Sequence, residues 1–374
     1  MKIVYNTDQI YQHGGIEKVM ATKVNYLVAQ SDIEVFVVTT EQKNHAPCYP
    51  LDTRVVLVDL HVNYDRTQSY FSFTNAKKAL VHIIRQRRLY KKIQPDVIIS
   101  PNYNFDHFWL PFIKPKKSKL FKEIHSSRFQ EPLLRKQKGF LNWLHWKLQD
   151  WIEGKYDKVI VLNKDEALYR PHNNVVVLPN PVESFAGTAK LDSKKVMAAG
   201  RIAPVKGFDQ LIQAWALVHQ QCPDWELHIY GDDYNGTLLD LNALIATLGL
   251  QDVVQIKSSV PNLMLTMQDY SIFALSSQTE CFPTVLLESL VVGLPIVSFD
   301  CPNGPRNILK ANQDGFLVSE HNISQFAGAL LVLIQNKELR IQMGVNAREN
   351  SDRFHVTTIM QEWLQLINNN SNEF

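Results

Sequence analysis

The chain has 374 residues, of which 45% are hydrophobic and 10% aromatic, and its formal net charge is +2. This length predicts two domains with ordinary buried cores. No run reaches the roughly 18 apolar residues that span a bilayer, and the first residues lack the apolar segment of a signal peptide, so we expect a cytoplasmic protein. The cysteines form neither a C-x2-C pair nor a zinc quartet, which argues against a structural metal and fits a reducing compartment.

Charge is divided unevenly along the chain. Residues 1–178 hold 27 Lys and Arg against 17 Asp and Glu, whereas residues 179–374 hold 12 against 20. Local basic clusters lie at residues 85–92, 114–119 and 135–138. Such clusters are usually solvated faces, and nucleic acid is their other standard partner. No RNA- or DNA-binding module accompanies them, so we expect no nucleic-acid partner.

Strand-like apolar runs alternate with helical stretches in both halves of the chain. In the first half these runs are residues 2–5, 34–39, 55–58, 97–100, 119–124 and 158–162. In the second half they are residues 195–199, 226–230, 253–257, 271–275 and 295–298. The alternation predicts an α/β protein with two doubly wound parallel sheets. Pro179 and Pro181 punctuate a β-rich segment that begins at residue 175, and this segment is the predicted interdomain linker.

Two glycines follow the first predicted strand. Gly14 and Gly15 stand in a loop that opens a helix, and glycine lets a backbone approach a ligand closely. The loop lacks the G-x-G-x-x-G fingerprint, which argues against a dinucleotide site.

His125 directly follows the predicted strand at residues 119–124. A single histidine in such a place is more often a structural residue than a catalyst. No Ser/His/Asp set with the spacing of a nucleophile elbow is visible in the sequence. In a site, His125 would contact a sugar or orient an acceptor.

Residues 140–152 predict a helix with two different faces. The stripe that we expect to be core consists of Leu141, Leu144, Leu148, Trp151 and Ile152. Trp143 and Trp146 fall on the opposite, polar face, beside a lysine. That position suits an interfacial membrane contact or a sugar-stacking platform, and cover by a neighbouring loop is an equal alternative.

A predicted strand, loop and helix at residues 196–215 carry two cations. Arg201 and Lys206 lie in the loop, which Gly200 and Gly207 flank. Departure of a nucleoside diphosphate leaves negative charge on its β-phosphate, and two cations on a rigid loop can stabilise that charge without a metal. The alternative for a loop Arg or Lys is a solvated surface charge.

Two carboxylates eight residues apart, Glu280 and Glu288, lie on either side of a predicted helix start. Pro283 can open this helix without losing a needed donor, and Gly293 ends it. Ligands of open α/β sheets bind at the carboxyl ends of strands, and free amides at a helix N-terminus attract phosphate. We therefore expect a pyrophosphate at residues 282–285, with Glu280 on sugar hydroxyls and Glu288 on a ribose diol. The alternative is an electrostatic cap and a solvated helix residue.

The segment 280–288 resembles the E-x7-E motif of GT-B retaining glycosyltransferases of family 4, with Phe282 as the aromatic residue two places after the first Glu. Pro283 and the downstream segment 299–305, Phe-Asp-Cys-Pro-Asn-Gly-Pro, are similar to a bacterial polysaccharide and lipopolysaccharide subgroup. Cys281 stands where that subgroup has Gly.

This resemblance implies the GT-B fold, in which two Rossmann-like domains face each other across a cleft. It implies an acceptor-binding domain at residues 1–178, a donor-binding domain at residues 179–356, and a final helix at about residues 357–367 that packs back on the first domain. The catalytic residues it implies are His125, Arg201, Lys206 and Glu280. The donor-binding residues it implies are Gly14, Gly15, Arg201, Lys206, Phe282, Thr284, Val285 and Glu288. Members of the family generally need no metal, and we expect no cofactor besides the donor substrate.

The expected function is transfer of a hexose or N-acetylhexosamine from a sugar nucleotide to a glycan acceptor, with retention of configuration, in surface polysaccharide synthesis. UDP is the expected nucleotide and GDP is its rival. We expect a lipid-linked acceptor and a basic first domain that rests on the anionic inner face of the plasma membrane. Two alternatives stay open: a sugar-nucleotide epimerase of the same architecture, and a non-catalytic nucleotide-sugar binding subunit. The sequence contains no identifiable epimerase set of carboxylates and histidines, and a silent subunit would lack Lys206 or a motif glutamate.

Overall fold

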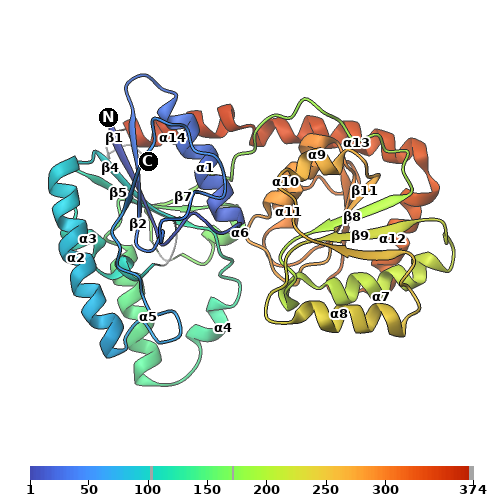
Figure 1. The fold of residues 1–374 in the computed structure, drawn as a ribbon, viewed down its shortest axis with the longest axis horizontal. Helices are drawn as coiled ribbons and strands as arrows, with labels where there is room; N and C mark the ends of the chain where they lie inside the picture. The colour runs from blue at the N-terminus through green and yellow to red at the C-terminus, as the bar shows by residue number, and fades with distance from the viewer. Residues whose placement is uncertain (102–103, 171, 370–374) are drawn as a thin grey trace. The chain divides into compact units, whose positions relative to one another are not determined.

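The computed structural model describes residues 1–101, 104–170 and 172–369, which form two compact units (Figure 1). The first unit is Met1–Pro181 together with the chain from Val356 onward, and the second is Val182–His355. The division therefore falls three residues beyond the predicted boundary, and the last helix, α14 (Val356–Asn368), belongs to the first unit.

The first unit is built on a parallel sheet of seven strands in the order β3-β2-β1-β4-β5-β6-β7. Its strands are β1 (Lys2–Thr7), β2 (Glu34–Thr39), β3 (Val56–Asp59), β4 (Val97–Ser100), β5 (Lys119–Ile124), β6 (Lys158–Val161) and β7 (Val175–Val177). The first residues of the predicted linker, 175–177, form a strand that pairs with β6 at the edge of the sheet, whereas the boundary between the units falls at the end of the predicted segment, between Pro181 and Val182. The sequence pattern showed an apolar β-rich run there, but it did not show that the run has a neighbour.

Helices cover both faces of this first sheet, as successive side chains of a strand point to opposite faces. Along β1, Ile3 and Tyr5 join the core beneath α1 (Gly15–Val28) and α14, while Val4 joins the core on the other face. The remaining helical segments of the unit are α2 (Phe73–Ile93), η1 (Phe105–Phe108), α3 (Leu110–Ile113), α4 (Glu131–Arg135), α5 (Phe140–Glu153) and α6 (Lys164–Ala167).

The second unit has a parallel sheet of six strands in the order β10-β9-β8-β11-β12-β13. Its strands are β8 (Lys195–Ala199), β9 (Glu226–Tyr230), β10 (Val254–Lys257), β11 (Ile272–Leu275), β12 (Ile296–Phe299) and β13 (Gly315–Val318). Its helical segments are η2 (Pro204–Lys206), α7 (Phe208–His219), α8 (Thr237–Thr247), α9 (Leu263–Met267), α10 (Thr284–Val292), α11 (Pro305–Ile308), α12 (Ile323–Gln335), α13 (Lys337–Ser351) and η3 (Asp352–Phe354). The strand order reverses between β8 and β11, which is the switch point where open α/β sheets bind ligands. The two doubly wound sheets confirm the predicted fold class.

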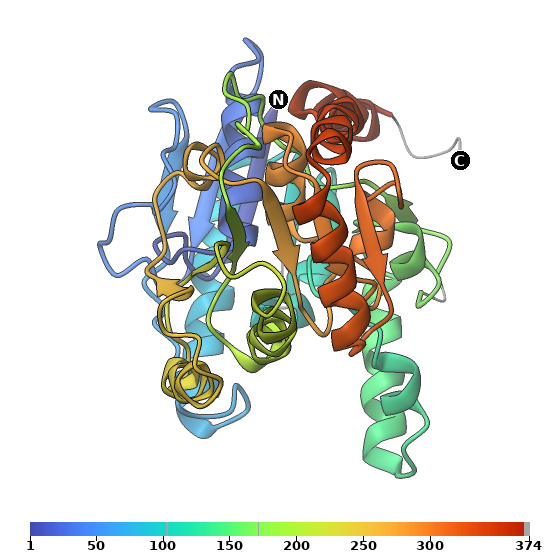
Figure 2. The same cartoon turned by 90° about the vertical axis from the view of Figure 1, so that its right-hand side faces the viewer.

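Helix α5 contradicts the prediction of a core stripe. Of that stripe, Ile152 is buried, but Leu141, Leu144, Leu148 and Trp151 are exposed. The periodicity identified an apolar face correctly but could not say whether that face meets the protein or the solvent. Figures 1 and 2 show α5 and the short α4 extending together away from the sheet of the first unit.

Candidate functional site

The loops that follow β8 and β11 are joined by hydrogen bonds at the switch point of the second sheet. The Ser276 hydroxyl donates to the carbonyl oxygen of Lys206 at 2.9 Å, and the Gln278 amide donates to the carbonyl oxygen of Val205 at 2.8 Å. Gly207, with a φ of 60°, permits this approach, because a Cβ there would overlap the Ser276 carbonyl oxygen. The backbone therefore fixes where the Lys206 side chain begins.

Lys206 and Glu280 form an ion pair in this junction. The Lys206 Nζ lies 2.7 Å from Glu280 Oε1, and the Ser277 hydroxyl donates to the same carboxylate oxygen at 2.7 Å. The two charged side chains are 21% and 12% exposed, so both remain reachable from solvent. Two predicted site residues that are far apart in the sequence are thus brought together.

The predicted motif segment 299–305 supports the Glu280 loop from the side. Glu280 bridges to Asn303, and a Cβ at Gly304 would lie 2.8 Å from both the Glu280 Cβ and the Pro283 Cδ. Glycine at this position therefore lets the two segments touch. The neighbouring Cys301 is buried, and this burial, with the nearby Glu280 charge, raises the pKa of its thiol well above the usual value.

Helix α10 begins at Thr284, directly after this loop. No side chain caps its N-terminus, its first turn carries no acidic residue, and Thr284 and Val285 are half-buried. Phe282 is buried and makes an edge-on ring contact with Phe354 at 5.6 Å, so it packs the loop against the unit. Free amides and a positive helix end favour an anion at this point.

Glu288 lies inside α10 and is only 3% exposed. The alternative that it is an ordinary solvated helix residue is therefore wrong. A carboxylate in such a place needs charged or hydrogen-bonding neighbours.

Arg201 contacts an aromatic ring of another loop. Its guanidinium is exposed and stacks over the Tyr234 ring at 4.9 Å. The carbonyl oxygen of the next residue, Ile202, accepts a hydrogen bond from the Tyr234 amide at 2.9 Å and so holds the Tyr234 loop. The sequence analysis missed Tyr234, because nothing in the sequence couples an exposed loop tyrosine to a cation thirty-odd residues earlier.

In the first unit, Gly14 precedes α1 and Gly15 is its first residue. The loop before them is closed by Gln9, whose side-chain oxygen accepts the amides of Tyr11 and Gln12 at 2.7 and 2.8 Å. The Gln9 amide group also donates to Glu17 Oε1 at 2.9 Å. Gln9 was missed in the sequence, although a polar side chain that folds back on its own loop is a common turn device.

His125 follows β5 and is held by a buried charge pair. Its Nε2 lies 2.8 Å from Glu123 Oε2, which is also 2.8 Å from the Lys23 Nζ, and all three side chains are at most 4% exposed. The Lys23 ammonium in turn lies 4.4 Å from the centre of the Trp363 ring of α14. Burial alone raises the pKa of Glu123, but Lys23 and His125 together lower it to about 2, so the carboxylate is ionised.

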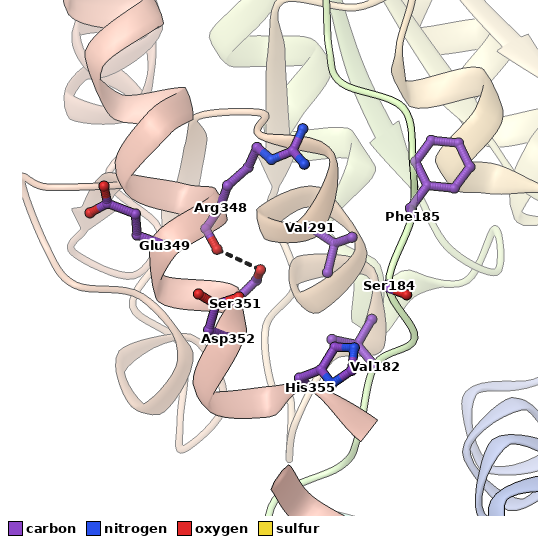
Figure 3. A pocket seen from close by; sticks show the side chains of 9 residues that line it. All are labelled: Val182, Ser184, Phe185, Val291, Arg348, Glu349, Ser351, Asp352 and His355. Carbon is purple, nitrogen blue, oxygen red and sulfur yellow. Dashed lines mark hydrogen bonds between the residues drawn. The ribbon is translucent and has the colours of Figure 1, made fainter. Parts of the chain in front are cut away.

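A separate pocket of about 270 Å³ lies in the second unit and contains none of the predicted site residues (Figure 3). Its lining residues are Val182, Ser184, Phe185, Val291, Arg348, Glu349, Ser351, Asp352 and His355. Figure 3 shows the Ser351 hydroxyl donating to the Arg348 carbonyl oxygen, at 2.6 Å. Within the described ranges, no group of three or more His, Cys, Asp or Glu side chains is arranged to hold a metal ion.

Comparison with known proteins identifies the chemistry. Residues 180–350 match the family model of glycosyl transferases group 1. An uncharacterised glycosyltransferase of Haemophilus influenzae is 27% identical over 376 residues, which cover 97% of this chain and 98% of that protein. The chain is a glycosyltransferase. Its group 1 match covers nearly all of the second unit, including the loops after β8 and β11.

Two further likenesses span nearly all of the given chain. The GalNAc-α-(1→4)-GalNAc-α-(1→3)-diNAcBac-PP-undecaprenol α-1,4-N-acetyl-D-galactosaminyltransferase of Campylobacter jejuni is 25% identical over 369 residues, which cover 95% of each chain. A crystal structure of TarM from S. aureus, in complex with UDP and α-GlcNAc-glycerol among its ligands, has a TM-score of 0.77 at 18% identity and covers 98% of this chain and 100% of that one. The likeness to TarM confirms the GT-B fold.

Proposed function

We propose that this glycosyltransferase moves a hexose or N-acetylhexosamine from UDP, with GDP as the rival nucleotide, to a glycan acceptor with retention of configuration. The observation that carries the proposal is the Lys206–Glu280 pair, 2.7 Å apart at the switch point of the second sheet. We assign Lys206 as the cation for the leaving diphosphate and Glu280 as the carboxylate for the sugar hydroxyls. The UDP bound by TarM supports the choice of nucleotide.

In this proposal, Lys206 and Arg201 stabilise the charge that develops on the β-phosphate, and the amides of Thr284 and Val285 bind the diphosphate. Glu280 accepts hydrogen bonds from the sugar, and Glu288 binds the ribose. Without a donor, Glu280 neutralises Lys206, so donor binding replaces part of this ion pair with a Lys206–phosphate contact. No metal is required for this charge balance.

Three residues of the first unit complete the assignment. Gly14 and Gly15 permit a close approach of the backbone to the donor. His125 contacts the sugar or orients the acceptor, and Glu123 fixes its ring by bonding Nε2. In the transfer step the bond from the anomeric carbon to the β-phosphate oxygen breaks, and the acceptor hydroxyl forms the new bond on the same face. The hydroxyl proton passes to the departing diphosphate.

We further propose a lipid-linked acceptor in surface polysaccharide synthesis, used at the inner face of the plasma membrane. The Campylobacter relative, whose name contains an undecaprenol-linked glycan, supports this acceptor class. None of the helices in the described ranges is long and apolar enough to cross a bilayer. Basic clusters in the first unit provide reversible attraction to anionic lipids.

A panel of UDP- and GDP-sugars, offered with a mixture of glycan acceptors, tests the proposal through release of free nucleotide. Lys206→Ala should lower turnover by on the order of a hundredfold, because a preorganised charge at the leaving group is lost. Lys190→Ala is the matched control, since Lys190 forms an exposed ion pair with Asp269 at 2.8 Å in the same unit, and it should leave turnover unchanged.

The outcomes separate the alternatives. Nucleotide release with a new glycoside supports transfer. An isomerised sugar nucleotide without glycoside indicates an epimerase, and no reaction with any donor indicates a non-catalytic binding subunit. Equal turnover of folded Lys206→Ala and wild type would remove Lys206 from the site.

A further inference from the structure

Helix α5 is oriented opposite to an ordinary surface helix, because its polar face meets the protein. Gln149 Oε1 lies 2.9 Å from the buried His107 Nε2, and Glu153 is buried and bonded to Arg128 at 2.5 Å. Asn142 donates to the Leu134 carbonyl oxygen at 3.1 Å and so joins α5 to α4. These contacts fix the rotation of the helix about its axis.

The opposite face of α5 is apolar and exposed. Six large side chains are between 42% and 78% exposed: Phe140, Leu141, Trp143, Leu144, Leu148 and Trp151. Phe112, itself exposed, stacks on Trp151 with ring centres 5.5 Å apart and extends the face. Contiguous exposed apolar surface of this kind marks a site of interaction.

Trp146 is not part of this face. Its indole Nε1 donates to Asn142 Oδ1 at 3.0 Å, and the Arg135 guanidinium lies 4.5 Å from its ring centre. The expectation that Trp143 and Trp146 share a face is therefore wrong, and Trp143 belongs with the leucines of the apolar face.

The charges around the apolar face are selectively positive. Each carboxylate of α4 and α5 forms an ion pair with arginine: Glu131 and Asp150 with Arg135, and Glu153 with Arg128 and Arg170. Four lysines in and beside these helices are exposed: Lys136, Lys138, Lys147 and Lys155. The Nζ of Lys155 lies 5.4 Å from the centre of the Trp151 ring.

We propose that the apolar face of α5 docks the first unit on an anionic bilayer surface. The helix lies in the plane of the interface, with its leucine and aromatic side chains at the acyl boundary and the lysines at the phosphates. Its 14 residues span about 21 Å, which suits a helix lying on a membrane rather than crossing it. The proposal identifies the surface that makes the membrane contact in the proposed function, and it rests on that function only for the identity of the acceptor.

Lipid explains the combination better than a protein partner does. An apolar protein groove would match the leucines but has no need for the exposed lysines beside them, whereas anionic lipid offers both an apolar layer and a sheet of negative charge. Because the carboxylates of α4 and α5 are paired with arginines, they add little repulsion between this helix and an anionic lipid surface.

Sedimentation of the full chain with vesicles tests the docking. One set of vesicles is phosphatidylcholine alone, and the other is phosphatidylcholine and phosphatidylglycerol in equal parts. Wild type should bind the anionic vesicles at least about tenfold more tightly at low salt and should be released as salt rises, because each lysine near the surface contributes roughly a fivefold gain.

The decisive variant replaces Leu141, Leu144 and Leu148 with Gln, which keeps helix propensity and removes the apolar contact. Binding to anionic vesicles should fall by at least about tenfold, as burial of even one leucine is worth that much. The matched control replaces three leucines that are exposed elsewhere, Leu168, Leu239 and Leu265, with Gln and should bind as wild type does.

Three results would overturn the proposal: no binding of wild type to anionic vesicles, equal binding of the two triple variants, or a wild-type dimer without vesicles that the α5 variant converts to a monomer. The last result would assign the face to a second copy of the chain. Calorimetric binding of UDP and transfer to a water-soluble glycan, measured on the α5 variant, separate a failure of docking from a failure of the proposed function.

Discussion

At the level of single residues, the candidate site is organised by shared hydrogen-bond acceptors. Glu280 Oε1 accepts from both Lys206 and Ser277 at 2.7 Å, so this carboxylate is held in one orientation before any ligand binds. Glu288, in contrast, is buried inside α10. The two motif glutamates therefore stand in different surroundings, although the sequence gives them the same chemistry.

This difference leads to different effects on nucleotide affinity. Glu288→Gln should weaken UDP binding by roughly tenfold or more, because a charged hydrogen bond to the ribose is lost. Glu280→Gln should leave UDP affinity near the wild-type value and lower affinity for the UDP-sugar. Titration calorimetry with UDP and with UDP-sugar measures both effects.

Glu338→Gln serves as the control, since Glu338 is exposed on α13 and lies outside the proposed site. Equal losses of UDP affinity in the two motif variants would contradict the separate roles of Glu280 and Glu288.

Single residues also show the limit of prediction from sequence. The residue types at positions 206 and 280 were sufficient to predict a cation and a carboxylate in the site. They could not predict that the two side chains form an ion pair, because the distance between Lys206 and Glu280 depends on how the loops after β8 and β11 meet. Gln9 and Tyr234 were missed for the same reason. Their partners are set by loop conformation, which no periodic pattern encodes.

At the scale of elements, the donor site depends on the close approach of two loops. Gly207→Ala should destabilise the second unit more than Gly236→Ala does. Each glycine directly precedes a helix and has a positive φ, 60° at Gly207 and 82° at Gly236. An alanine at either position therefore costs about 1 kcal/mol of backbone strain. Only at Gly207 does the added Cβ also meet backbone, the Ser276 carbonyl, which should add about 1 kcal/mol or more.

Urea denaturation of the two variants measures this difference in the free energy of unfolding. Gly207→Ala should also reduce turnover, because the Lys206 backbone shifts away from Ser276. Equal destabilisation by the two substitutions would show that the loops can separate at no cost.

The ion pair between Glu123 of β5 and Lys23 of α1 should make the stability of the fold depend on pH in the acid range. The pKa of Glu123 is lowered from 4.5 to about 2 in the folded chain, so its ionised form stabilises the fold fully above pH 4.5. That contribution is lost as pH falls from 4.5 towards 2. Replacing the pair by Lys23→Met with Glu123→Gln should therefore flatten the fall in melting temperature over this range.

Circular dichroism melts between pH 7 and pH 3 compare the double variant with wild type. Lys190→Met with Asp269→Asn, which removes an exposed ion pair, is the control and should follow the wild-type curve. Parallel curves for all three proteins would mean that Glu123 titrates in the folded chain as it does in the unfolded one.

Elements were predicted best where a strand is buried on both faces, as in β1 and β11, because such runs are continuously apolar. Strand β13 was missed, since its four residues begin with Gly315 and follow a polar loop. The orientation of α5 was predicted wrongly, because an apolar stripe looks the same in sequence whether it faces a core or the solvent.

At the scale of the whole molecule, two doubly wound units each place a set of polar residues at the carboxyl ends of their strands. His125 follows β5 in the first unit, and the Lys206–Glu280 pair follows β8 and β11 in the second. The chain returns to the first unit through α14, where Trp363 is fully buried and Lys119 Nζ donates to the Ile367 carbonyl oxygen at 2.8 Å. Both ends of the described chain are therefore needed to complete one unit.

Transfer of a sugar with retention of configuration is the reaction proposed for this molecule. Proton NMR of a reaction containing an α-linked UDP-sugar and an acceptor glycan tests it in one measurement, because anomeric couplings report both the loss of the donor and the configuration of the product. With retention, a new α-glycosidic signal should grow as the donor signal declines. A new β-glycosidic signal would contradict retention, and conversion of the donor to an isomeric sugar nucleotide with no new glycoside would contradict transfer itself.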